Sequence, residues 1–434
     1  MAGQCASEWK RIGLMGLVVP LLLATPLGAE GRFRLLVEGE TGVRDDGGYG
    51  QQQDPALRQD RTLGRAGLDI QLSYALERLN LALGYSPYYE RTLNDPAVSG
   101  TTHRLDFGLV GDLSRTLKLD VRDRLLKTPN LDLYSPAAGP ETTVVTQRGD
   151  QLINTLDVGF TQAFSRRASV VLAATHDVRK YQEAGLFDSE SLGGRLGAAF
   201  EVGRAQRIEA AAGLFRYDYK ERGDSDVRTL GLAFGTEIGR DNHLRLEAGS
   251  YSVDSTIRHP GLALPEETVS DSGWRGSLQF SQERRLFHWN LGASHDISPG
   301  SGLGRAVTAD NAFAGVSTVV RRNLTLGLDG SASRQRDLED DRLSAGAPDS
   351  PERGRALTEF AAGTARFGWT FSPAFRLDGG YSRVWQRSRV AEFANLSYSR
   401  YFLGLAVRLY SSGETPVPPA DLGRTSTDEK PDSQ

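Results

Sequence analysis

Residues 104–109 of the chain, RLDFGL, alternate polar and apolar side chains and decide the fold. Leu105, Phe107 and Leu109 fall on one side of an extended backbone, because successive side chains of a β-strand point to opposite faces. The same alternation returns at 324–328 and 375–381, and in further segments of roughly ten residues each from 32 to 410. Each segment therefore has one apolar and one polar face, which is typical of strands that separate lipid from water.

The N-terminal residues have the parts of a secretion signal. Lys10 and Arg11 form a short basic region, residues 12–27 are mostly apolar, and the small residues Gly28 and Ala29 end a cleavage site. A membrane-anchoring helix is the alternative, but the apolar segment is short and contains two prolines. We therefore expect a signal peptide over 1–29, a barrel over 30–410, and a polar, disordered tail over 411–434.

Composition excludes several classes of protein. The only cysteine, Cys5, lies in the signal, so the mature chain has no thiol for a disulfide or a metal site. Hydrophobic residues make up 39% of the chain, too few for a helical membrane protein but sufficient for a barrel, whose strands need only one apolar face. No basic patch with interleaved aromatic residues indicates a nucleic-acid partner.

Short and long connections alternate along the chain. Short ones are expected near 76–78, 114–116, 165–167, 203–206, 239–242, 283–285, 321–322 and 372–374. Long ones are expected near 44–60, 90–102, 128–150, 181–189, 221–226, 257–270, 298–306, 337–355 and 388–392. They predict an all-β fold: a transmembrane antiparallel up-and-down β-barrel of about eighteen strands, with sixteen as the alternative. Outer-membrane barrels of Gram-negative bacteria have short periplasmic turns and long extracellular loops, which places both termini in the periplasm.

Aromatic residues gather where strands are expected to end. A soluble sandwich or solenoid would not explain this arrangement, whereas outer-membrane barrels carry aromatic girdles at both interfaces. One group lies late in its hairpin, at Tyr74, Tyr85, Tyr88 and Tyr89. A second group flanks short turns, at Phe287, Trp289, Phe367, Trp369, Phe371 and Phe375.

Opposite charges two residues apart recur shortly after four short turns. Residues i and i+2 share a strand face, so these side chains are predicted to point into the lumen at similar depth. Two interpretations are open. The side chains form a constriction that screens solutes by charge, or they form a ladder of salt bridges, and we favour the ladder. The candidate residues are Lys118, Asp120, Arg122, Arg207, Glu209, Arg245, Glu247, Arg376 and Asp378.

The chain lacks the pattern of an enzyme. Ser294 and His295 are adjacent, so in a strand they point apart and cannot form a catalytic pair, and His176 and Asp177 are separated in the same way. No histidines have metal-ligand spacing. The acidic residues Asp337, Glu339, Asp340 and Asp341 are candidates for a cation site, but a solvated loop is favoured because the glycine-spaced calcium pattern is missing. We expect no catalytic residue, metal or cofactor.

The alternating stretch 395–410, NLSYSRYFLGLAVRLY, has the form of a closing barrel strand. With the signal and the barrel pattern, it resembles the β-barrel porins of exopolysaccharide and sorting loci in Gram-negative bacteria. The resemblance implies that Tyr398, Phe402, Leu405 and Tyr410 belong to the strand that the barrel-assembly machinery reads. Here that strand is followed by a tail, a departure from the usual C-terminal position.

The resemblance also implies an outer-membrane conduit that works with a periplasmic polysaccharide export protein. The leading hypothesis is therefore export of a surface polysaccharide. A passive diffusion or uptake porin is an alternative, and a structural or adhesive barrel is another. Outer-membrane lipid and lipopolysaccharide are the expected surroundings.

Overall fold

Eighteen β-strands of 12 to 18 residues account for the described part of the chain. The computed structural model describes residues 32–49, 59–93, 99–129, 151–182, 187–203, 205–239, 241–258, 266–284, 286–298, 306–337, 358–388 and 395–411. The strands are β1 (Arg32–Tyr49), β2 (Gln59–Ala75), β3 (Leu79–Thr92), β4 (Ser99–Asp112), β5 (Leu117–Thr128), β6 (Gln151–Ala163), β7 (Ala168–Tyr181), β8 (Ser189–Glu201), β9 (Gln206–Tyr219), β10 (Gly223–Glu237), β11 (Asn242–Ile257), β12 (Glu267–Glu283), β13 (Phe287–Ser298), β14 (Val307–Arg321), β15 (Leu324–Asp337), β16 (Thr358–Ser372), β17 (Phe375–Ser388) and β18 (Leu396–Ser411).

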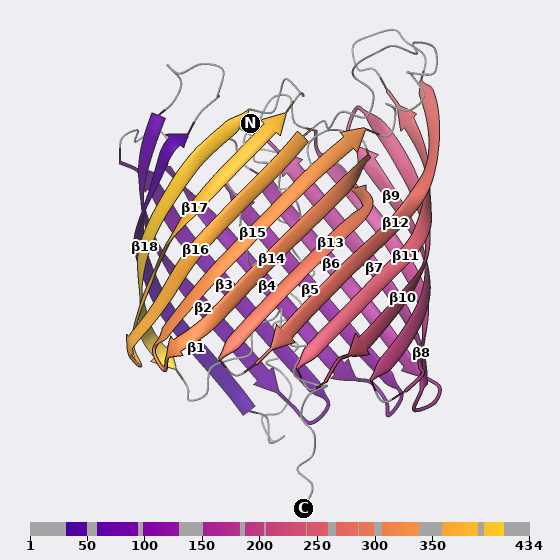
Figure 1. The fold of residues 1–434 in the computed structure, drawn as a ribbon, viewed down its shortest axis with the longest axis horizontal. Coiled ribbons are helices and arrows are strands. Elements are labelled where there is room, and N and C mark those ends of the chain that lie inside the picture. Colours follow the sequence, from indigo (N-terminus) through magenta and orange to yellow (C-terminus); the bar gives the residue numbers. More distant parts are fainter. Residues whose placement is uncertain are drawn as a thin grey trace, which may run out of the picture.

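The strands form a single closed sheet. Each pairs antiparallel with its neighbours in the chain, and β1 pairs with both β2 and β18. The result is a barrel of tilted strands (Figure 1). The predicted antiparallel up-and-down barrel is confirmed, and its strand number is eighteen rather than sixteen.

The eight short connections lie where the sequence predicts them, all at one end, which we call the short-turn end. Serine side chains stabilise two of these turns: the Ser114 hydroxyl accepts the backbone N–H of Leu117, and the Ser165 hydroxyl accepts that of Ala168, each at 3.0 Å. Such side-chain bonds satisfy backbone donors that the ladder leaves free. Because the strand number is even, Arg32 and Ser411 both lie at the short-turn end.

The nine remaining connections lie at the opposite, long-loop end, but one is shorter than predicted. Only residues 220–222 join β9 to β10, whereas a long loop was expected near 221–226. Glu221 and Gly223 have φ values of +67° and +126°, which allow a tight reversal. Asp224 and Asp226, polar residues typical of a loop, belong instead to strand β10.

Several predictions concern residues outside the described ranges. These are the signal peptide, Cys5, the tail beyond Ser411, and Glu339, Asp340 and Asp341 of the acidic run. No helix in the described residues is long and apolar enough to cross a membrane.

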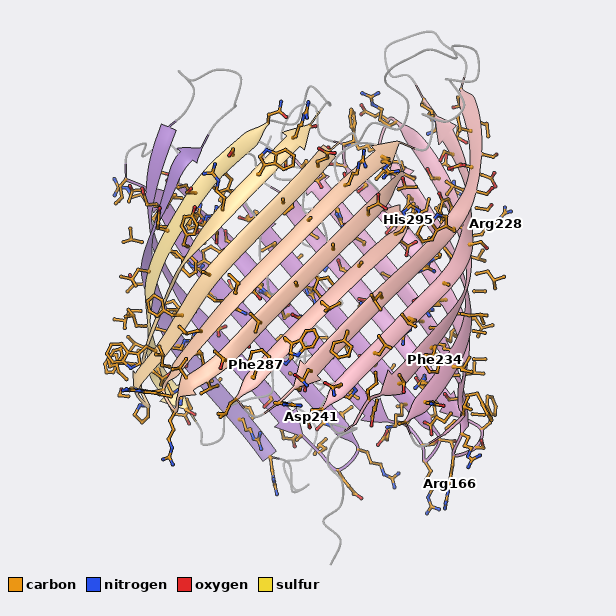
Figure 2. All side chains as sticks on the ribbon, viewed as in Figure 1. Arg166, Arg228, Phe234, Asp241, Phe287 and His295 are labelled. Atoms are coloured by element: carbon orange, nitrogen blue, oxygen red, sulfur yellow. The ribbon has the colours of Figure 1, made fainter. Side chains whose placement is uncertain are left out.

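The two faces of the wall differ in chemistry. In β8–β12, large exposed apolar side chains occupy even positions, and the charged side chains of the short-turn half occupy odd ones. The even set also contains Arg228, which projects outward from the wall (Figure 2). Alternation therefore puts the apolar set outside and the odd-numbered charges on the inner face. The exposed apolar residues of these strands include Leu192, Leu196, Leu214, Leu230, Leu232, Leu246, Trp274 and Leu278.

Aromatic side chains line the outside of the short-turn end. Phe287 lies low on β13 (Figure 2), and Phe371 packs between Trp369 and Phe375 at centroid distances of 5.6 and 5.7 Å. All four of these rings are at least 40% exposed. In water this surface would be costly, so it favours contact with a membrane interface.

Candidate functional site

The inner face of the short-turn half carries all nine predicted lumen residues. Strand alternation places them there, near the starts of β5, β9, β11 and β17. Three of their cationic side chains, Lys118, Arg245 and Arg376, are 42–55% exposed. This part of the wall is therefore open to solvent, and its role as a constriction stays a prediction.

Only two of the four predicted sets form ion pairs within their own strand. Arg122 contacts Asp120 at 2.9 Å, and Arg376 contacts Asp378 at 2.6 Å. Lys118 instead lies 3.9 Å from Asp112 on β4. The carboxylates of the other two sets take partners from different strands, which the spacing alone does not reveal.

Glu209 is the centre of a cross-strand group of ion pairs that joins β8, β9 and β11. Its side chain is 12% exposed and contacts Arg195 of β8 at 2.9 Å and Arg245 of β11 at 3.6 Å. Arg245 lies two strands away from Glu209. The inward side chains of β10 at this level, Ala233 and Gly235, are small enough to leave room for the contact.

Arg275 is the centre of a second group on β11, β12 and β13, and was missed by the sequence prediction. It contacts Glu247 at 3.2 Å and Asp296 of β13 at 2.8 Å. Arg275 has no opposite charge at i±2 in its strand, so only the register of β11, β12 and β13 could have identified it. Together these contacts form a ladder of alternating charge along the inner wall.

Many inward side chains near the long-loop end are buried. Inward residues on strands around the barrel are at most 2% exposed, in contrast to the charged residues nearer the short turns. They include Asp46, Thr92, Thr102, Thr128, Tyr219, Val253, Val307, Gln335, Thr358, Gln386 and Tyr398. These inward side chains are thus less exposed than Lys118, Arg245 and Arg376 nearer the short turns.

One sector of the inner face at this end is apolar. Tyr217, Tyr219, Val227, Tyr251 and Val253 pack together on the inward faces of β9, β10 and β11. The sequence prediction did not identify this cluster, because tyrosine and valine in a strand fit an inward or an outward position equally well.

A buried ion pair joins the first strand to the last at the long-loop end. The Arg400 guanidinium donates from Nε to Asp46 at 2.8 Å, and Arg44 contacts the same carboxylate at 3.1 Å. Asp46 is 1% exposed and Arg400 7%. This ion pair links β1 to β18 where they close the sheet, and we call this place the seam.

The four residues of the predicted insertion strand do not share a face. Tyr398 is inward and fully buried, Phe402 has the same parity, and Leu405 has the opposite one. Tyr410 is exposed near the short-turn end. Recognition of this strand by the assembly machinery stays a prediction.

Histidines form polar pairs on the outer face. His295 contacts Asp310 at 2.6 Å and His176 contacts Glu190 at 2.9 Å, whereas Asp296 points inward to Arg275. The adjacent residues 295 and 296 therefore point apart, as strand geometry requires. Within the described ranges, no group of three His, Cys, Asp or Glu residues could hold a metal ion.

Comparisons with known proteins do not define a family for this chain. No protein-family model matches it, and no curated protein does either. Among solved structures it is similar to Pseudomonas aeruginosa OccK2 (OpdF), with 12% identity, a TM-score of 0.41, and coverage of 88% of this chain and 98% of that one. It is also similar to P. aeruginosa OccK5 (OpdH), with 10% identity, a TM-score of 0.43, and coverage of 87% and 98%. Acinetobacter baumannii OccAB4 has 9% identity, a TM-score of 0.43, and coverage of 88% and 99%. Likenesses at this level do not identify a solute.

Proposed function

We propose that this chain is an outer-membrane channel that passes small hydrophilic solutes. The observation that carries the proposal is the contrast between the two faces of one closed wall. The outside is apolar with an aromatic rim, and the inside carries the charged ladder of Arg195, Glu209, Arg245, Glu247 and Arg275. Such a wall suits lipid on one side and water on the other.

The buried inward side chains at the long-loop end favour small solutes over a polymer. A conduit for an exported polysaccharide, the leading sequence hypothesis, needs a passage that stays wide to the outer rim. Thr102, Thr128, Val307 and Gln386 are instead buried on well-separated strands there. We therefore prefer the passive diffusion or uptake porin, and keep polysaccharide export as the alternative that the experiment addresses.

The wall also supports weak charge selectivity. Arginines and carboxylates contact each other along it, so the field of one sign is compensated by the other within a few ångströms. A ring of one sign would select ions strongly, whereas alternating signs orient water and solute dipoles.

Planar-bilayer recording of the purified full-length protein tests the proposal, with liposome swelling in sugars of increasing length. We expect stepwise conductance, entry of monosaccharides, and exclusion of long oligosaccharides. Absence of conductance steps would support the structural or adhesive barrel. Equal entry of short and long oligosaccharides would support a polymer conduit, and loss of surface polysaccharide in a deletion strain would then test export directly.

A further inference from the structure

A row of ionisable side chains crosses the outer face of the barrel near the long-loop end. His295, Asp310, Arg334, Glu359 and Arg387 lie directly opposite one another, strand by strand, from β13 to β17. Each has the parity of an exposed apolar residue lower on its own strand, such as Leu328 on β15 and Trp369 on β16. The row therefore faces the surroundings of the barrel rather than its lumen.

Two further arginines widen the row into a basic patch. Arg336 contacts Asp310 at 3.1 Å, and Arg383 donates to the hydroxyls of Ser397 and Ser399 at 2.8 Å each. We define the basic patch as Asp310, Arg334, Arg336, Glu359, Arg383 and Arg387. Its four arginines outnumber its two carboxylates, although the whole chain has a net charge of −4.

The opposite sign prevails on the same face elsewhere. On β9–β11, the described outward charges near the long-loop end are two arginines and four aspartates, and Arg216 already contacts Asp224 at 2.8 Å. Those residues are Arg216, Asp218, Asp224, Asp226, Arg228 and Asp254. The positive excess on β14–β17 thus contrasts with the acidic sector on β9–β11.

The level of the basic patch matches a lipid headgroup region. Trp274 is 64% exposed, and its ring stacks on that of His295, the first residue of the row, at a centroid distance of 4.2 Å. His295 lies high on the wall, far from Phe287 at the short-turn end (Figure 2). Aromatic side chains of this kind mark the membrane interface, and charges on the lipid side are tolerated there but costly at the midplane.

We propose that the basic patch binds the phosphorylated headgroup of lipopolysaccharide in the outer leaflet. The inference rests on the outer-membrane location in the proposed function. Arg334 on β15 and Arg387 on β17 both lie opposite Glu359 on β16, so they are two strands, about 10 Å, apart. Arg336 extends the patch on β15, and Arg383 lies four residues from Arg387 toward the short-turn end. The two arginine pairs suit a headgroup with two separated phosphates, because guanidinium groups bind phosphate through paired N–H donors. The apolar rows below, such as Leu326 and Leu328, lie where its acyl chains would pack.

The experiment measures binding of fluorescent deep-rough lipopolysaccharide to the purified full-length barrel in detergent. The test variant is R383Q/R387Q, with R387Q alone as a milder second variant. The control is R216Q/R228Q, which removes two arginines from the same face in its acidic sector. A heat-modifiability gel verifies that each variant is folded.

We expect R383Q/R387Q to weaken binding at least about ten-fold, which corresponds to one charge-assisted contact, while the control binds like the wild type. Equal losses in both variants, or no loss in either, would overturn the proposal. Displacement by phosphatidylglycerol at matched concentration would also overturn it, since the patch would then bind any anionic lipid. Conductance of the wild type is recorded separately, so that failure of the channel proposal is distinguished from failure of this one.

Discussion

Replacing Asp46 by asparagine tests whether the buried seam pair holds the barrel closed. The change keeps the shape of the side chain and removes its charge. Arg400, whose side chain is 9% exposed, would then retain a buried cation without its carboxylate at 2.8 Å. Breaking a buried pair in this way costs about 3–5 kcal/mol, because the remaining charge stays desolvated.

Glu40 provides a matched control on the same strand and the same inner face. It contacts Arg65 at 3.3 Å, but the two side chains are 35% and 42% exposed, so water replaces the lost partner. We therefore expect E40Q to lower the free energy of unfolding by less than about 1 kcal/mol.

The assay is equilibrium unfolding in urea of the barrel reconstituted in lipid vesicles, followed by tryptophan fluorescence. The double variant D46N/R400Q should recover part of the stability, because it also removes the stranded cation. Equal losses of unfolding free energy in D46N and E40Q would show that the seam pair does not hold the barrel closed. A lower free energy of unfolding for D46N/R400Q than for D46N would show the same.

Two more predictions concern the wall. Neutralising four predicted lumen cations should leave ion selectivity nearly unchanged, because their side chains are solvated. The melting temperature should fall modestly, because several of them form ion pairs. A clear shift of the reversal potential toward cation selectivity would instead place the narrowest region of the lumen at this level. The four residues are Lys118, Arg207, Arg245 and Arg376. Gly249→Ala should destabilise the barrel by about 1–3 kcal/mol, because its Cβ would press on the Leu230 carbonyl and lie 2.7 Å from the Gly231 Cα. Gly330→Ala should leave the stability of the barrel unchanged, because its Cβ would meet nothing closer than 3.8 Å. Equal fractions of folded protein for the two variants on heat-modifiability gels would contradict this prediction.

The sequence by itself determined the strands, their number and their faces. Alternation and turn chemistry are local properties, so residues 104–109 identify their own strand, and Ser114 and Ser165 their own turns. Local signals failed most clearly at 220–222, where polar residues typical of a loop continue a strand after a tight reversal. The nine predicted lumen residues follow from the same period of two, which fixes the face of a residue but not its partner.

Only the tertiary structure decided which charges meet. Asp46 and Arg400 are 354 residues apart in sequence, and closure of β1 on β18 brings them together. Glu209 contacts Arg245 across β10 because the side chains between them are small. The outer row from His295 to Arg387 depends on four successive strand registers. A shift of one residue in any register would move every side chain of the shifted strand to the opposite face, so partners that lie across strands cannot be determined from the period of one strand.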